Sequence, residues 1–477
     1  MFTYNFKYEL KSLLRSRWII LLFAILLIVV LFAGYNGNKK VNKRLVDIEK
    51  VTSAVEKKDK AMLSLLDSIE KGLKNNARSW RMPNDPMGVG FEHPRVAALH
   101  PKDLAFISVG QSDLFTHFVQ PKIYGDNFAL NYSELSSPIQ LLFGSFDLSF
   151  VIIYILPLII IAFSYNILSN EKEYGSLKLL AAQPISVYSW LLQKVGLRFL
   201  WLALITVLVL TISFGVVGFD FANNIGEFSS LLLLTISYIL FWFVVALMVN
   251  IFIGSSAKNA VSLLGIWVFV ILIIPAVVSQ FSNVVYPIPS RTKMLSEIRK
   301  VKDQTAKKQD KILDNFLRDH PEYASKGGNI NYTFWHKYIA TQDLIEEELK
   351  PLLDSYNNQL QNQQQWIKRW QYISPAVIMQ QSFNELAGTS TKHYQDYRKQ
   401  VAEFSVTWRD FFTPMLYNNQ PFQSKIYKDL PQFEYKEPKM SSMIFNTFIV
   451  LVFSILTLLI SSILYQRKIK KESIIIG

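Results

Sequence analysis

Apolar residues along this chain are gathered in six blocks that polar segments separate. Each block is close to the 20 or so residues that a helix needs to cross about 30 Å of hydrocarbon. The first block is the shortest, and Tyr35-Asn36 after it do not fit a signal-peptide cleavage site, so we expect it to be retained. The pattern predicts an all-α polytopic membrane protein with six transmembrane helices. The blocks are Trp18–Gly34, Leu148–Leu168, Leu197–Val217, Ser229–Ile253, Ala260–Phe281 and Met443–Tyr465.

The first of two long polar segments, 35–147, lies between the first two blocks. An apolar stripe at helical spacing runs through it from Val41 to Ile69, and Gly72 is expected to end that helix. The stretch Met82–Pro101 is rich in Pro, Gly and His and predicts a loop. The remainder carries mixed signals that assign no element.

The second long segment, 282–441, lies before the last block and repeats this design. Helical patterns cover Lys293–Asp319 and Tyr332–Tyr372, with Pro351 either breaking or starting a helix in the longer one. Ser374-Pro375 predicts a further helix start and Gly388 its end. Charged helices of this length need a partner for their apolar stripe. We therefore expect a largely helical extracytoplasmic region, in which the two segments pack on each other or on those of a second subunit.

The N-terminal residues 1–17 predict an amphipathic helix that runs into the first span. Lys7, Lys11 and Arg15 recur at steps of four beside an apolar face. A helix of this kind lies in the membrane interface. It is either a basic anchor on lipid or a helix that packs on a cytosolic partner, and the sequence leaves both open.

Basic residues decide the orientation. Of the 50 Lys and Arg residues, 13 lie outside the two long segments, and all 13 fall on one side of a six-span arrangement. They lie in 1–17, in the connection 169–196 and at its boundary with the third span, in the connection before the fifth span, and in the tail 466–477. The positive-inside rule places this side in the cytoplasm. We expect a bacterial inner-membrane protein with both termini cytoplasmic and both long segments, 35–147 and 282–441, extracytoplasmic.

Composition adds two restrictions. The net charge of +13 is mostly orientation charge facing anionic lipid headgroups, so it does not indicate a nucleic acid partner. The chain has no cysteine, so extracytoplasmic domains without disulfides must be held by packing, which fits a bacterial protein.

Motifs for catalysis or nucleotide binding are absent from the sequence: there is no G-x-x-x-x-G-K-[ST], no H-E-x-x-H and no G-x-S-x-G. The six histidines lie in the long segments at irregular spacing. His93, His100 and His117 could form a metal site, but surface or loop histidines are the better interpretation. The spans lack interior acidic or basic residues, which disfavours an ion-coupled transporter. We expect no enzyme activity, metal or cofactor in this chain, and an energy source elsewhere.

The connection between the second and third spans, 169–196, contains the one conspicuous motif. It reads N-E-K-E-Y-G-S-L-K-L-L-A-A-Q-P-I-S from Asn170 to Ser186. Gly175 permits a tight reversal, the leucines after it form a short apolar helix, and Pro184 ends that helix. An ordinary short loop is the plain interpretation. A short apolar helix between Gly and Pro is also suited to docking in a groove on another protein.

This motif resembles the signature E-x-G-[ST]-L-x-x-L-L…P-[VI]-S of type-2 ABC transporter permeases, which also have a basic N-terminal helix and six spans. The resemblance implies that the connection is a coupling helix seated on a separate ATPase. It implies two ATPase subunits that bind ATP and Mg²⁺, and a second copy of this chain or a similar permease. The residues it would assign to coupling are Glu171, Glu173, Gly175, Ser176, Leu177, Leu180 and Pro184.

A second resemblance is to a bacterial branch of permeases of unknown function in which both outside segments are enlarged. It rests on the S-P-A element at Ser374-Pro375-Ala376 and the L-A-G-T element from Leu386 to Thr389. We interpret this stretch as a capped helix rather than as a ligand site.

Two functions follow as hypotheses. The chain is the membrane subunit of an ATP-driven exporter, with Pro157 and Pro275 able to localise bending of the second and fifth spans. Alternatively, it passes ATP-driven movement to an extracytoplasmic protein and moves nothing across the membrane. A plain receptor or scaffold does not explain the motif. The substrate stays open, although uncharged spans favour a lipid or apolar moiety over a small ion.

Overall fold

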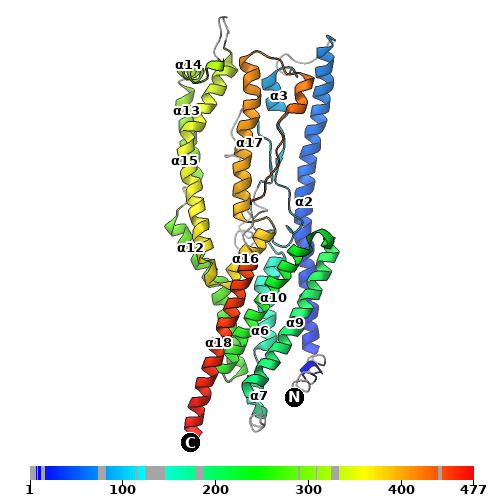
Figure 1. The fold of residues 1–477 in the computed structure, drawn as a ribbon, viewed down its shortest axis with the longest axis vertical. Coiled ribbons are helices and arrows are strands. Elements are labelled where there is room, and N and C mark those ends of the chain that lie inside the picture. Colours follow the sequence, from blue (N-terminus) through cyan, green and yellow to red (C-terminus); the bar gives the residue numbers. More distant parts are fainter. Residues whose placement is uncertain are drawn as a thin grey trace.

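The computed structural model describes residues 7, 9–11, 15, 17–73, 82–110, 112, 116–123, 145–177, 186–287, 291–307, 309–323, 332–438 and 443–476. Among these residues, six helical stretches are long and apolar enough to cross a membrane, which confirms the predicted fold class. Both termini lie at one end of the molecule, here called the terminal end, and the two long segments rise at the other, the insert end (Figure 1). The stretches are α2 (Arg17–Glu70), α5–η4–α6 (Leu148–Phe150, Val151–Ile155, Leu156–Ser164) with α7 (Ser169–Glu173), α9 (Val187–Val217), α10 (Phe221–Phe252), α11–η5–α12 (Ser256–Val268, Phe269–Ile273, Ile274–Val285) and α18 (Met443–Ile476).

Helix α2 continues without a break from the first span to the far tip of the insert end. Its 54 residues correspond to about 80 Å at 1.5 Å per residue. The predicted helix over Val41–Ile69 is its upper part, and Gly72 follows its end with a φ of +71°, as expected. At Gly37 a Cβ would lie 2.1 Å from the carbonyl oxygen of Phe106, so glycine lets the helix contact that backbone directly.

In its described residues the first long segment also holds three short elements, helix α3 (Pro86–Glu92) and strands β1 (Ala97–Ala98) and β2 (Phe118–Val119). The strands pair antiparallel, Ala97 with Val119. The prediction of a loop throughout Met82–Pro101 is therefore wrong. Asp85 caps α3 by accepting from the Met87 amide, and Pro86 occupies the first turn, where its missing N–H costs nothing.

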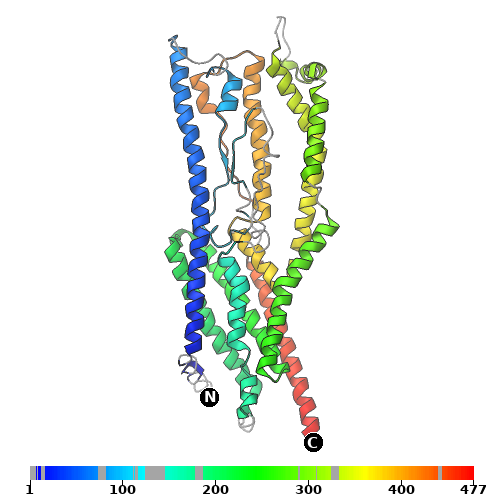
Figure 2. The ribbon, with the colours of Figure 1, turned by 180° about the vertical axis from the view of Figure 1, so that it is seen from behind.

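The second long segment forms an arm and a central helix. The arm consists of α13 (Arg291–Ala306), α14 (Gln309–Asp319) and α15 (Phe334–Trp370), followed by η7 (Gln371–Ile373); η6 (Pro321–Tyr323) joins its upper end. The pattern over Lys293–Asp319 thus forms two helices instead of one, whereas α15 continues through Pro351, which is exposed. Helix α17 (Thr391–Tyr417) stands between the arm and α2 (Figures 1 and 2) and is followed by η8 (Ser424–Asp429).

The two long segments share one hydrophobic core, so they pack on each other within a single chain. Helix α2 contributes Met62 and Leu66, and the second segment contributes large buried rings such as Trp408 and Phe412. The Trp408 indole donates to the Gly90 carbonyl of α3 over 3.0 Å. Of the two packing arrangements expected from the sequence, the structure shows the one within the chain.

A buried acidic group on α2 joins the same two segments. Asp59 accepts hydrogen bonds from Tyr427 (2.8 Å) and Arg95, and its other oxygen lies 2.9 Å from His93 Nδ1. Burial by itself raises the pKa of Asp59, but the hydrogen bonds of His93 and Tyr427 and the charge of Arg95 outweigh burial and hold it below its ordinary value. This cluster fixes α2 against η8.

Helix α16 (Pro375–Leu386) turns back from the arm into the top of the bundle. Ser374 caps it by accepting from the Ala376 amide, and Gly388 follows its end with a φ of +68°, so both predicted helix signals are confirmed. Its apolar residues belong to the core of the spans, and Ser382 accepts from Asn446 of α18 over 2.9 Å. The sequence had led us to expect the whole segment 282–441 outside the bundle of spans. Helix α16 lies within that bundle instead.

A polar joint connects the end of α16 to the top of the second span. Ser108 donates to Asn384 over 2.6 Å, and the Thr389 hydroxyl donates to the Ser108 carbonyl over 2.6 Å. Asp147, the N-cap of the second span, accepts from the amides of Val109 and Phe150, each over 2.9 Å. The joint therefore ties both long segments to the second span at one place.

Candidate functional site

The connection between the second and third spans lies at the terminal end, where α7 ends and the chain reverses. Gly175 has a φ of +75°, a left-handed conformation that glycine adopts without strain. The helix that contains the third span, α9, begins at Val187, ten residues before the predicted start of that span at Leu197. Leu180 and Pro184 of the predicted site fall in 178–185, outside the described residues.

The two motif glutamates face different spans. Glu171 accepts from Lys194 of α9 over 3.0 Å and from the hydroxyl of Ser176. Glu173 accepts from the backbone amide (2.7 Å) and the hydroxyl (2.9 Å) of Ser256, the first residue of α11. A carboxylate at a helix N-terminus is favoured by the unpaired amides and the helix dipole. The structure thus ties this connection to the third span and to the fifth.

Two asparagines, which the sequence analysis missed, bind the end of the second span just before the glutamates in sequence. The Asn250 amide accepts from the Leu168 backbone (3.3 Å) and donates to the Ser164 carbonyl (3.0 Å), while Asn259 donates to the Tyr165 carbonyl over 2.9 Å. These contacts satisfy backbone groups where the second span ends and α7 begins. An asparagine within the fourth apolar block and another directly before the fifth were the available signal, since buried amides need partners.

Among the described residues of the connection, one apolar side chain is covered and another is exposed. Leu177 packs on the core of the spans, whereas Tyr174, directly before Gly175, is 81% exposed. Tyr174 was not among the predicted site residues, although it stands within the motif directly before Gly175. An exposed aromatic ring with a firmly held backbone below it is suited to insertion into a partner.

The N-terminal residues contact the same end of the bundle through a residue the sequence analysis missed. Lys7, Lys11 and Arg15 are exposed, while Glu9 accepts from Arg198 of α9 over 3.1 Å. Arg198 also donates to the Phe163 carbonyl over 2.6 Å. Arg198 lies eleven residues into α9 and at the boundary of the predicted third span, not in its interior. Glu9 compensates the charge that burial would otherwise penalise.

The second and fifth spans each contain a π-helical turn directly before a proline. The turns are Val151–Ile155 before Pro157 and Phe269–Ile273 before Pro275. Proline has no N–H, so a carbonyl one turn earlier loses its helical donor. Wider π turns are local irregularities that frequently mark functional sites in helices.

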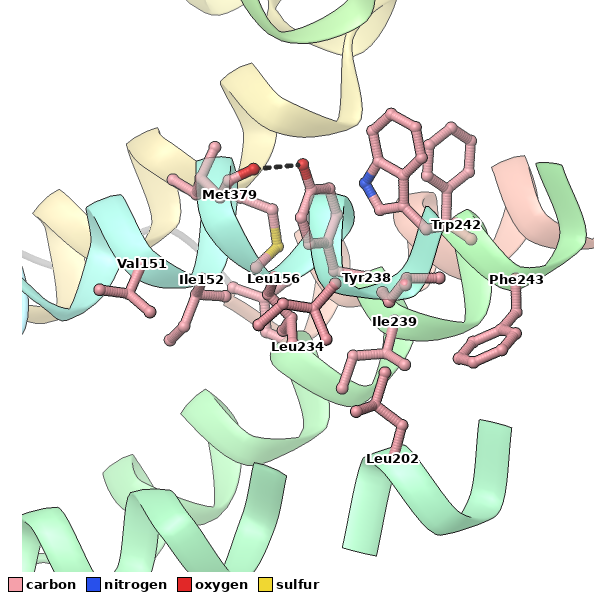
Figure 3. Close-up of a cluster of buried hydrophobic side chains, with 14 of the residues drawn as sticks. Val151, Ile152, Leu156, Leu202, Leu234, Tyr238, Ile239, Trp242, Phe243 and Met379 are labelled. Carbon is pink, nitrogen blue, oxygen red and sulfur yellow. Dashed lines mark hydrogen bonds between the residues drawn. The ribbon is translucent and has the colours of Figure 1, made fainter. Parts of the chain in front are cut away.

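Side chains of neighbouring elements satisfy carbonyls in both turns. The Tyr238 hydroxyl of α10 donates to the Ile153 carbonyl over 3.1 Å, the bond drawn dashed in Figure 3. The Ser374 hydroxyl donates to the Val270 carbonyl over 2.8 Å. Trp267 Nε1 donates to the Tyr154 carbonyl over 3.2 Å and so joins the two irregular spans. Bending at these prolines would therefore displace α10 and α16, which are hydrogen-bonded to the two turns.

The histidines weighed as a metal site have other surroundings. His93 contacts Asp59, and within the described ranges no group of three or more His, Cys, Asp or Glu residues is arranged to hold a metal ion.

Comparison with known proteins agrees with the motif. Residues 128–276 match the model of the ABC-2 family transporter protein, and residues 291–436 match a domain of unknown function (DUF3526). The first match covers the second span to most of the fifth, including the connection with Glu171 and Glu173, and the second covers the arm, α16 and α17. No curated protein matches the chain.

Proposed function

Because the chain belongs with the type-2 ABC permeases through its ABC-2 transporter domain, we propose that it is the membrane subunit of an ATP-driven exporter. The energy source is a separate ATPase that docks at the connection between the second and third spans. ATP and Mg²⁺ bind to that ATPase, and this chain itself catalyses no reaction.

The observation that carries the proposal is the double attachment of the docking connection. Through Glu173 a displacement of the connection pulls on the first turn of α11, and through Glu171 it pulls on α9. Charge-assisted hydrogen bonds of this kind are stronger than neutral ones, so these bonds can transmit force to α9 and α11 without breaking. Further along the second and fifth spans lie the π turns at Pro157 and Pro275, where bending is easiest.

The docking surface itself consists of the exposed Tyr174 and, as an expectation, the apolar helix that contains Leu180. The N-terminal segment is held beside it by Glu9 and Arg198, so it can contact the same ATPase with its exposed Lys7 and Lys11. Two ATPase copies then require two such surfaces.

A second permease copy, or a similar permease, provides the second surface. In the most apolar part of the fifth span only 11% of the residues are buried within the chain, and in that of the sixth only 22%. The corresponding share for the fourth span is 72%. The fifth and sixth spans therefore face lipid or another subunit. In this proposal the terminal end is cytoplasmic, in a bacterial inner membrane, and the 13 basic residues on this side support that orientation.

Replacement of Glu173 by Gln tests the coupling. The chain is purified together with its ATPase, reconstituted in liposomes, and its ATP hydrolysis is compared with that of the ATPase alone. Glu173→Gln and Gly175→Val should reduce hydrolysis to the rate of the uncoupled ATPase, while insertion into the membrane is unchanged. Hydrolysis and transport at the wild-type rate in both variants would refute the coupling role.

A second function is favoured by the continuity of α2. Because one helix of 54 residues joins the first span to the Asp59 cluster, tilting of that span moves the whole insert region. The chain would then drive an extracytoplasmic protein without moving a substrate across. Double electron–electron resonance between labels on α2 and α17 distinguishes the two. Movement of the insert region on ATP addition without transport of lipid or solute favours transmission of movement, and ATP-dependent transport favours export.

A further inference from the structure

The lower end of the arm descends along the fifth span to the level of the membrane surface. Gln363 donates to the Tyr286 carbonyl over 2.7 Å, whereas Ser374, eleven residues later, donates to the Val270 carbonyl over 2.8 Å. Between these contacts the chain passes 16 residues of the fifth span, or about 24 Å at 1.5 Å per residue. We call residues 366–373 of this descent the arm foot.

The depth of the arm foot follows from contacts between spans. Trp267 donates to the Tyr154 carbonyl, so these residues lie at one level, six residues below Leu148 where the second span begins. Ser374, at Val270, is then about 5 Å below that beginning, and Gln363, at Tyr286, is about 20 Å above it. Lys368 and Arg369 lie between the two, in the layer that headgroups occupy just outside the hydrocarbon.

The exposed side chains of the arm foot fit that layer. Lys368 and Arg369 are exposed, Trp370 is 39% exposed and Ile373 45%. The Trp366 and Trp370 rings lie 5.4 Å apart, which is the aromatic pair expected at a membrane–water interface. Within the described part of the chain, neither cation has a carboxylate partner.

Below the arm foot the surface is apolar. Phe445 of α18 is 52% exposed and lies against Tyr372, with ring centres 6.3 Å apart, and Ile444 beside it is 74% exposed. Two cations above an apolar surface at headgroup depth fit a molecule that has a negatively charged end and an apolar end. A negatively charged headgroup lies against the cations, and its acyl chains lie along Ile444 and Phe445.

We propose that the arm foot binds an anionic glycerophospholipid of the leaflet at the insert end. The bound headgroup neutralises Lys368 and Arg369 and holds the arm at a fixed height, and with it α16, which begins two residues after the arm foot. This role is independent of the proposed function, since it requires only that the six helices cross a membrane.

The absence of cysteine allows a site-specific test on the full chain. Gln365, exposed one turn before the cations, is replaced by Cys and labelled with a fluorophore in nanodiscs. Quenching is measured against the fraction of phosphatidylglycerol, or of phosphatidylcholine, that carries a nitroxide on its headgroup. The comparison is between the labelled chain, Lys368→Gln/Arg369→Gln, and Lys57→Gln/Lys58→Gln, an exposed basic pair on α2 far above the membrane.

The double variant of the arm foot should lose about 25-fold in apparent affinity for phosphatidylglycerol, at about five-fold per basic residue. Phosphatidylcholine should quench both chains equally, the Lys57/Lys58 variant should behave as wild type, and high salt should weaken the wild-type response. The melting temperature of the wild-type chain should also rise when phosphatidylglycerol is added, and that rise should be absent from the arm-foot variant.

Three results would overturn the proposal. Equal quenching by both lipids in all chains would mean that the arm foot has no preference for anionic lipid. If the melting temperature of the arm-foot variant is lower than that of the wild type by the same amount in both lipids, the cations only stabilise the C-terminus of α15 through its dipole. Energy transfer between labels on two chains, lost in the arm-foot variant, would assign the surface to a second copy instead.

Discussion

The hydrogen bond at the π turn of the second span allows the most quantitative prediction. Tyr238 is fully buried, and its hydroxyl donates to the Ile153 carbonyl, the group that would accept from residue 157 in a regular helix. Pro157 has no N–H to give. Tyr238→Phe therefore removes the side-chain donor of this carbonyl in an apolar interior.

The expected cost lies between two limits. Hydrogen bonds between membrane helices contribute about 0.6 kcal/mol on average and up to about 1.7. An unsatisfied buried carbonyl costs about 1–3 kcal/mol. We expect Tyr238→Phe to lower the free energy of unfolding by about 1–2 kcal/mol. Pro157→Ala supplies an N–H where the carbonyl can receive it, so in the double variant about 1 kcal/mol of that loss should be recovered.

The assay is reversible unfolding of the full chain in mixed micelles, followed by circular dichroism, for the wild type, both single variants and the double variant. Tyr188→Phe is the control for loss of a hydroxyl, because Tyr188 instead packs on the Tyr465 ring at 4.9 Å. If the effects of Tyr238→Phe and Pro157→Ala add, with no recovery in the double variant, the hydroxyl does not replace the missing helical donor.

Three further predictions concern the fold and its ends. Gly37→Ala places a Cβ 2.1 Å from a backbone oxygen and should cost about 3 kcal/mol, whereas Gly215→Ala, with nothing within 4 Å, should be neutral or stabilising; thermal unfolding in detergent compares them. Burial, and then a nearby lysine, lower the pKa of His393 to about 4. The unfolded chain, with an ordinary histidine pKa near 6.5, binds the proton first, so stability falls from about pH 6.5 to 4, by about 2 kcal/mol at pH 5; His393→Gln should remove this slope in pH-dependent melting. Glu9→Gln leaves Arg198 without its carboxylate and should speed tryptic cleavage of the N-terminal residues; unchanged cleavage would show that the pair does not hold them.

Features set by local chemistry could be predicted from the sequence. The spans follow from the length of apolar blocks, and the ends of α16 follow from Ser374-Pro375 and Gly388, which act on their own backbone. The reversal at Gly175 was predicted for the same reason. The motif also led directly to Glu171 and Glu173, although which spans they contact was not visible in it.

Features set by tertiary contacts could not be predicted. Helix α16 is too short to be recognised as a membrane element, and its position depends on partners such as Asn446 of α18. Glu9 and Arg198 are 189 residues apart, so no local pattern connects them. The π turns have no sequence signature beyond the proline that follows them, because neighbouring hydroxyls complete their hydrogen bonds.

The central claim is that the connection at the exposed Tyr174 docks on an ATPase, and a cross-link tests it most directly. Tyr174→Cys and Tyr35→Cys each place the only cysteine of the chain at an exposed tyrosine, one at the terminal end and one where the first span meets the insert region. Both are labelled with a photo-activated cross-linker in native membranes, and the products are identified by mass spectrometry. The account predicts that Tyr174→Cys is joined to a chain with a Walker A motif and Tyr35→Cys is not. A cross-link to such a chain from Tyr35→Cys, or from neither position, would contradict it.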